Sequence, residues 1–149
     1  MSEREQHLES IAETMADYRI SELPKATPEH VERWINQFDS DVQVPILREM
    51  DHVLERTYFS FQDVMNFLES VIAAEKLVGD DPCRFWRSAH FLDIQRGGNS
   101  QREMLALFDG LLQDACSLSI SECGEGSDVF IYLDDVIGSG TISTDNTSG

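Results

Sequence analysis

A short apolar segment that ends in two adjacent acids constrains the fold of this chain more than any other feature. Residues 129–133 read Val-Phe-Ile-Tyr-Leu, and Asp134, Asp135 and a glycine-containing turn follow them. A run of β-branched, aromatic and aliphatic residues is typical of a strand buried in a parallel sheet. Ligands of open α/β sheets lie beyond the carboxyl ends of such strands. The segment therefore predicts an α/β fold with a ligand edge directly after residue 133.

The residues after this strand have the chemistry of a sugar-phosphate site. Two carboxylates in one place raise each other's pKa unless a hydroxyl, a cation or a metal stabilises them, and ribose hydroxyls and Mg²⁺ both meet that need. The turn Gly138-Ser139-Gly140-Thr141 combines flexible backbone with small hydroxyl side chains. Successive N–H groups in such a turn can point at a phosphate.

This pattern of strand, paired acids and small-residue turn resembles the phosphoribosyl-pyrophosphate (PRPP) loop of type I phosphoribosyltransferases. The resemblance implies that Asp134 and Asp135 are the catalytic acids, which contact the ribose 2′- and 3′-hydroxyls and act on Mg²⁺ through the ligand or water. It implies a substrate-binding loop made of Val136, Ile137, Gly138, Ser139, Gly140 and Thr141. Two positions depart from the family pattern, because Gly138 and Ile142 stand where the family usually has threonine.

An earlier segment predicts the first half of a βαβ unit. Residues 89–94 have the composition of a strand, residues 95–99 form a glycine-containing turn, and a capping-box pattern at Ser100 to Glu103 begins a helix that reaches about residue 114. In type I phosphoribosyltransferases the equivalent loop binds pyrophosphate, and by that resemblance Arg96, Gly97 and Gly98 form the opposite wall of the site. An ordinary tight connection is the alternative reading of the two glycines. Residues 117–121 alternate polar and apolar side chains, which predicts one more strand.

The N-terminal half of the chain predicts a helical subdomain without catalytic chemistry. Helices are expected over residues 3–19, from Pro28, around residues 40–54 with regular hydrogen bonding from Pro45, and from residue 61. The expected buried positions in them are Leu8, Ile11, Ala12, Met15, Val31, Trp34, Ile35, Phe38, Ile46, Leu47, Met50, Val53, Leu54, Val64, Phe67, Leu68, Val71 and Ile72. The Trp34, Gln37 and Phe38 arrangement is similar to helical prefixes on phosphoribosyltransferase-like proteins of bacterial defence loci.

We expect three parts in the chain. Residues 1–79 form the helical subdomain, residues 80–141 a partial phosphoribosyltransferase-like α/β domain with a Rossmann-like parallel sheet, and residues 142–149 a disordered tail. The family's later strands and its base-recognising hood have no counterpart in the sequence. We therefore expect either the front portion of a longer protein or a shortened and inactive relative.

Charge and cysteine content limit the partners and the compartment. The 149-residue chain carries 28 acids and 11 bases, a net charge of −17, which disfavours general affinity for nucleic acids and anionic membranes. The three cysteines have no CxxC spacing, so they indicate neither a disulfide framework nor a zinc site. His7, His30 and His52 lack metal-site spacing and are expected in surface or capping roles. Without an apolar leader or span, the sequence favours a cytoplasmic protein.

The sequence does not meet the motif requirements of three other enzyme classes. A nucleoside triphosphatase requires a GxxxxGK[ST] loop, and neither lysine lies in one. An aspartyl phosphatase requires Asp-x-Asp at the end of the strand, whereas Asp134 and Asp135 are adjacent. A serine hydrolase requires a G-x-S-x-G elbow between a strand and a helix, and no helical pattern follows Ser139. The remaining alternative is a non-enzymatic module that senses a nucleotide or binds a protein, with the helical part used for partner binding or homo-oligomerisation.

Overall fold

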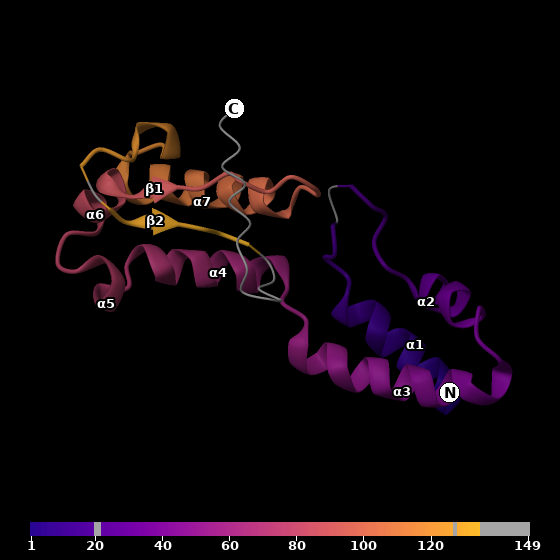
Figure 1. Cartoon of the computed structure of the whole chain (residues 1–149). Helices are drawn as coiled ribbons and strands as arrows, with labels where there is room; N and C mark the ends of the chain where they lie inside the picture. The colour runs from indigo at the N-terminus through magenta and orange to yellow at the C-terminus, as the bar shows by residue number, and fades with distance from the viewer. Residues whose placement is uncertain (20–21, 127, 135–149) are drawn as a thin grey trace. The chain divides into compact units, whose positions relative to one another are not determined.

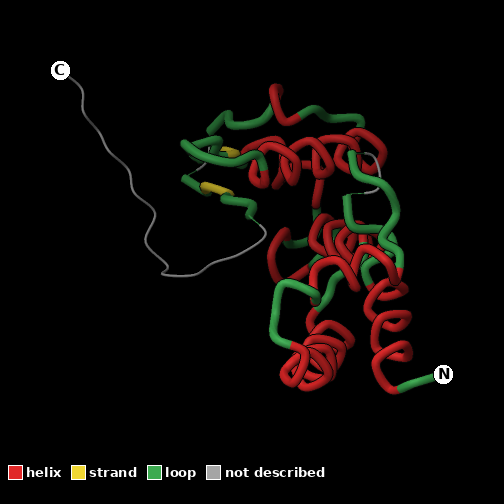
Figure 2. The backbone as a smooth tube through the Cα atoms, turned by 90° about the vertical axis from the view of Figure 1, so that its right-hand side faces the viewer, coloured by secondary structure: helices red, strands yellow, loops and turns green. Residues whose placement is uncertain are grey.

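The computed structural model describes residues 1–19, 22–126 and 128–134. Most of these residues are helical, and two short strands form one small parallel sheet (Figures 1 and 2). The elements in chain order are α1 (Glu3–Thr14), α2 (Pro28–Ile35), α3 (Ser40–Thr57), α4 (Phe61–Ile72), α5 (Glu75–Val78), α6 (Pro82–Ser88), β1 (His90–Phe91), α7 (Ser100–Cys116), a 3₁₀ turn η1 (Ile120–Glu122) and β2 (Phe130–Ile131). The chain divides into two compact units, residues 1–64 and a second that begins at Met65.

The first unit packs α1, α2 and α3 around a small apolar core. The core contains the buried residues Leu8, Ile11, Ala12, Val31, Ile35 and Leu47. All six were expected positions, because an apolar stripe at helical spacing favours burial on one helix face. Trp34 and Phe38 were expected in the core as well, yet they stay 39% and 37% exposed and pack edge to face on each other.

Local capping signals predict the starts of two helices correctly. α2 begins at Pro28, and the capping box of Thr27 and His30 precedes it. At α4 the Ser60 and Asp63 side chains each accept a hydrogen bond from the other's backbone N–H, at 3.0 and 2.9 Å. These motifs depend only on neighbouring residues and satisfy N–H groups that have no partner inside the helix.

The lengths of α1 and α3 differ from the expectation. α1 ends at Thr14 rather than at Arg19, and turns follow it. α3 begins at Ser40 and continues through Pro45, so the prediction that regular hydrogen bonding starts only near Pro45 was wrong. A proline removes one N–H donor from a helix, and the packing of Leu47 in the core stabilises the rest of this one.

The second unit contains the predicted βαβ arrangement in a short form. β1 pairs in parallel with β2, with His90 opposite Phe130 and Phe91 opposite Ile131, and α7 connects the two strands. The backbone N–H groups of His90 and Leu92 donate to the carbonyl oxygens of Val129 and Ile131, each at 2.9 Å. Residues 129–133 therefore contain a parallel strand, as the sequence predicts.

An aromatic cluster forms the core beside this sheet. Trp86 of α6 is fully buried against Phe91 of β1 and Phe108 of α7, with ring centroids 5.9 and 5.0 Å away. Its indole N–H donates to the carbonyl oxygen of Ile72 at 3.0 Å, so the only polar atom of the side chain is satisfied. This packing holds α6 and α7 next to β1.

Three expectations for the second unit were wrong. Phe130 is 62% exposed, so β2 is not a strand buried on both faces. Residues 117–121 form no strand, because Ser117 ends α7 in the left-handed conformation with φ +51° and η1 follows. Phe67, expected in the core stripe of α4, is 60% exposed.

Cys83 and Cys116 form a disulfide, which the sequence did not indicate. Their Cα atoms lie 5.4 Å apart although 33 positions separate them in the chain, and Cys123 is free. An odd cysteine count argues against a framework of several bonds, but it does not exclude one pair with a residue left over. Among the described residues, no helix is long and apolar enough to cross a membrane.

Candidate functional site

The carboxyl ends of β1 and β2 and the first turn of α7 meet at one edge of the second unit. Parallel pairing directs the segments that leave Phe91 and Ile131 to the same edge. The first segment runs through residues 92–99 into α7, and the second reaches Asp134 three residues after its strand. This is the edge at which ligands of α/β sheets bind.

Asp134 is held in this edge by two hydroxyl groups. The Ser100 hydroxyl, on the first residue of α7, donates to Oδ1 at 3.1 Å, and the Tyr132 hydroxyl donates to Oδ2 at 2.8 Å. Asp134 is only partly exposed. The negative charge therefore lies at a helix N-terminus, where the helix dipole stabilises it.

A pair of glutamines joins the loop after β1 to α7. Gln101 Oε1 accepts hydrogen bonds from the backbone N–H groups of Ile94 and Gln95, at 2.9 and 2.8 Å. Gln95 Oε1 accepts from the backbone N–H of Gln101 at 2.9 Å, and its Nε2 donates to the Ser100 hydroxyl at 3.0 Å. The contacts continue through Ser100 to Asp134, so one hydrogen-bond network orients the strand-end acid.

The glycine-containing turn lies between the two glutamines. Gly98 has φ +77°, a conformation that glycine adopts without strain, and a Cβ added there would lie 3.6 Å from Gln95 Nε2. Arg96 and Gly97 belong to the same turn, so the predicted opposite wall lies next to the first turn of α7. Arg102 of that turn is 3.8 Å from Asp93, which adds an exposed cation to this edge.

The whole of the predicted loop after Asp134 lies outside the described residues. This applies to Asp135, Val136, Ile137, Gly138, Ser139, Gly140 and Thr141, whose roles stay predictions. The structure brings together Asp134, Ser100 and the 95–101 segment.

The donor groups present suit a magnesium ion that arrives with a phosphorylated ligand. Among the described residues, no group of three or more His, Cys, Asp or Glu side chains could hold a metal. Mg²⁺ is commonly bound through one or two carboxylates, several waters and the phosphates of a substrate. Asp134 is one such carboxylate at this edge.

The sequence analysis did not identify Gln95, Gln101 and Tyr132 as parts of the site. It also gave Ser100 the wrong position at the start of its helix. The expected capping box would make Ser100 the N-cap, whereas Asn99 is the N-cap and Ser100 is the first helical residue. Its hydroxyl is therefore directed to Gln95 and Asp134. A glutamine buried completely, as Gln101 is, has no periodic pattern that reveals it before the fold is known.

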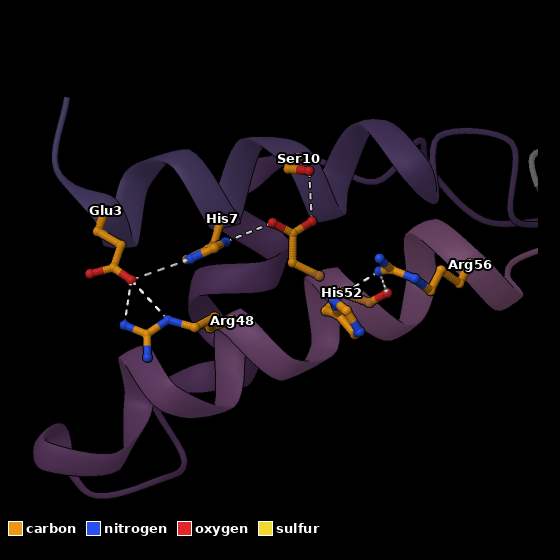
Figure 3. Close-up of polar contacts among 7 residues, drawn as sticks. Glu3, His7, Ser10, Arg48, His52 and Arg56 are labelled. Carbon is orange, nitrogen blue, oxygen red and sulfur yellow. Dashed lines mark hydrogen bonds and ion pairs between the residues drawn. The ribbon is translucent and has the colours of Figure 1, made fainter.

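A second polar cluster, in the first unit, joins α1 to α3 (Figure 3). Asp51 accepts from the Ser10 hydroxyl and contacts His7 Nδ1, both at 2.6 Å, and Arg48 pairs with Glu3 at 2.6 Å. The serine and the histidine both contact the aspartate rather than each other. A nucleophilic triad requires the histidine between the serine and the acid, so this cluster is structural.

The expectation of a surface or capping role holds for His30 and His52 but was wrong for His7, whose side chain is only 19% exposed and contacts Asp51 of α3. His30 caps α2, with the backbone N–H of Thr27 3.3 Å from its Nδ1. His52 is exposed and contacts Arg56 one turn later at 2.8 Å.

Comparisons with known proteins give one match. The PRTase-CE family model matches residues 31–147, which is most of the chain. No curated protein and no solved structure shows a significant match.

Proposed function

This chain belongs to the PRTase-CE family, a phosphoribosyltransferase-type family, and from that premise we propose that it binds a PRPP-type ribose 5-phosphate ligand with Mg²⁺. The site is the edge where β1, β2 and the N-terminus of α7 meet. The matched range contains all three elements and the loop after Asp134. Their parallel βαβ connection supports the proposal, because ligands of α/β sheets lie beyond the carboxyl ends of such strands.

The proposal rests on the hydrogen bonds that the Asp134 carboxylate accepts from two hydroxyl groups. Its two carboxylate oxygens accept from the Ser100 and Tyr132 hydroxyls, at 3.1 and 2.8 Å. The 2′- and 3′-hydroxyls of a ribose are donors of the same kind. They can add to this carboxylate or replace its present partners, because a carboxylate accepts about four hydrogen bonds. Asp135 follows directly and would supply the second carboxylate.

The phosphate groups of the ligand need cations and N–H donors, and the same edge has both. The N-terminus of α7 carries a partial positive charge, and Arg96 and Arg102 lie before and within its first turn. The glycine turn at Gly97 and Gly98 allows close approach of a diphosphate to the backbone. The backbone and hydroxyls of Gly138, Ser139, Gly140 and Thr141 would hold the 5′-phosphate, which leaves Val136 and Ile137 to connect the acids to that turn.

A reaction at this site would break the bond between the anomeric carbon and the diphosphate oxygen, and an acceptor nucleophile or water would form the new bond to that carbon. Asp134 and Asp135 would orient the ribose and stabilise the positive charge that develops on it. Bound Mg²⁺ would supply charge neutralisation for the departing diphosphate. If no turnover accompanies binding, the protein acts as a nucleotide sensor or interaction module.

Calorimetric titration with PRPP and Mg²⁺ tests the proposal. We expect wild-type protein to bind PRPP, and the Asp134→Asn/Asp135→Asn variant to lose at least about tenfold in affinity, because each charged hydrogen bond contributes about 1.5–3 kcal/mol. Chelation of Mg²⁺ should weaken wild-type binding. Release of pyrophosphate in the same samples would show that the protein hydrolyses PRPP.

Asp128→Asn is the matched control, since Asp128 is an exposed aspartate near the opposite end of the same strand. It should leave PRPP affinity unchanged. Absence of wild-type binding, or equal losses in the control and the double variant, would overturn the proposal.

A further inference from the structure

The disulfide between Cys83 and Cys116 encloses one wall of the proposed ligand site. Cys83 lies in the first turn of α6 and Cys116 is the last residue of α7, so the bond joins the start of one helix to the end of another. Between them the chain passes through β1 and the 95–101 segment, whose hydrogen bonds continue through Ser100 to Asp134. The bond therefore closes a ring that contains every element of this edge except β2.

The part of the ring that forms the site is held by few contacts. β1 and β2 contain two residues each and form a two-stranded sheet. The backbone N–H groups of Ile94 and Gln95 both depend on one acceptor, Gln101 Oε1. The middle of the ring is packed more firmly, because Trp86 is fully buried against Phe108. Segments with few contacts open locally at low cost, so we expect the site to respond first when the ring is opened.

The disulfide is accessible, and the third cysteine is a poor competitor for it. Cys83 and Cys116 are both partly exposed, so an external thiol can reach the bond. Burial raises the pKa of the free Cys123 thiol, and the charges of Glu122 and Asp109 raise it further. A thiol attacks a disulfide as the thiolate. The bond therefore exchanges with external thiols in preference to rearranging within the chain.

The compartment that the sequence favours gives such a bond a meaning. Thiol systems keep most cysteines of the cytoplasm reduced, and the disulfides that do form there are usually transient. Bonds that serve only stability are typical of oxidising compartments. An accessible disulfide that encloses a ligand site fits the transient kind.

We propose that the bond between Cys83 and Cys116 is a reversible redox switch for the ligand site, with the oxidised form as the binding form. The inference rests on the proposed function for its ligand. In the reduced form β1 and the 95–101 segment open more often, so a smaller fraction of the molecules is competent to bind. The apparent affinity for PRPP falls by that fraction.

The chemistry of the switch is thiol–disulfide exchange. Two thiols of glutathione, or the two thiols of a dithiol protein, transfer two electrons and two protons to the bond. The S–S bond of Cys83 and Cys116 breaks and leaves two cysteine thiols, while the reductant becomes a disulfide. Exchange with oxidised glutathione runs the same steps in reverse and restores the bond.

Hydrogen exchange tests the switch without a ligand. We compare the oxidised wild type with the same protein reduced by dithiothreitol. The amides of Ile94 and Gln95 should exchange at least about tenfold faster in the reduced protein, because their acceptor Gln101 belongs to the segment that opens. The amides of α3, in the first unit, are the internal control and should exchange equally in both forms.

Calorimetric titration with PRPP and Mg²⁺ tests the consequence for binding. Reduction should lower the affinity about tenfold, because opening the ring removes part of the stabilisation that a cross-link of this span provides. Reoxidation with oxidised glutathione should restore the affinity. Cys83→Ser/Cys116→Ser should bind as weakly as the reduced wild type, with and without dithiothreitol.

Cys123→Ser is the matched control, since it removes the cysteine outside the bond. It should keep the full response to dithiothreitol. Recovery on reoxidation, together with a retained helical signal of the reduced protein in far-ultraviolet circular dichroism, separates a switch from irreversible unfolding.

The two proposals fail by different measurements. Equal exchange of Ile94 and Gln95 in the oxidised and reduced forms would overturn the switch. Equal PRPP affinities of these forms, or a lost response in Cys123→Ser, would overturn it as well. If the oxidised protein binds no PRPP while exchange still depends on the thiol state, the proposed ligand is wrong and the thiol-dependent opening of this edge is supported.

Discussion

At the scale of single residues, Gln101 determines how the loop after β1 meets α7. Its Oε1 accepts from two consecutive backbone N–H groups, and the side chain is fully buried. Its Nε2 has no hydrogen-bond partner among the described residues. The amide oxygen therefore satisfies two part-buried backbone donors, which stabilises the loop. The buried Nε2 without a partner among the described residues lowers that gain.

Gln101→Leu tests this role. The substitution keeps a side chain of similar size and removes the acceptor, which leaves two backbone N–H groups without a partner. We expect a loss of about 2–4 kcal/mol in the free energy of unfolding of the second unit, measured by urea denaturation. Gln113→Leu, at an exposed site on the same helix, should change it by less than about 0.5 kcal/mol. Equal effects would mean that the Gln101 contacts contribute nothing specific.

At the scale of elements, polar contacts fix α1 against α3 alongside their apolar core. Asp51 accepts from Ser10 and contacts His7, and its side chain is only 13% exposed. Partial burial strengthens such contacts relative to surface ion pairs, which contribute little. The side chains of Arg48 and Glu3 are both more than half exposed, so this ion pair contributes little to stability and mainly orients α1 on α3.

Asp51→Ala should therefore destabilise the first unit by about 2–4 kcal/mol, because two charge-assisted hydrogen bonds are lost together. Thermal unfolding followed by circular dichroism measures the effect. Glu49→Ala, two positions earlier and exposed, serves as the comparison and should shift the midpoint little. A midpoint for Asp51→Ala as high as that of Glu49→Ala would contradict the assigned role.

At the scale of the whole molecule, one covalent bond closes a long loop. The disulfide between Cys83 and Cys116 joins α6 to the end of α7 across 33 positions, so the enclosed segment contains β1 and the 95–101 network. A cross-link of this span stabilises chiefly by restricting the unfolded chain.

We expect Cys116→Ser to lower the free energy of unfolding of the second unit by about 2–4 kcal/mol under non-reducing conditions. Trp86, in the core of that unit, reports its unfolding by fluorescence in a Trp34→Phe background. Cys123→Ser, which removes the free cysteine, is the control. Coincident unfolding curves of wild type with and without reductant would show that the bond contributes no stability. The cytoplasmic location stays a prediction.

Local patterns in the sequence determined the starts of α2 and α4, the caps of these two helices and the order of the βαβ unit. The start of α2 at Pro28, the capping pair of Ser60 and Asp63, and a strand at residues 129–133 depend on neighbouring residues. Capping and rotamer preferences depend on residues a few positions apart, so they can be recognised from the sequence alone. The family resemblance was also local, because it rested on one loop motif.

Only the tertiary structure decided which side chains meet across the chain. Pairing of Ser100 with Asp134, of Ser10 with Asp51 and of Cys83 with Cys116 spans 33 to 41 positions. The same packing left Phe67 and Phe130 exposed although their composition favoured burial. Such contacts depend on how helices and strands pack in three dimensions, and hydrophobic periodicity specifies the face of an element without specifying its partner.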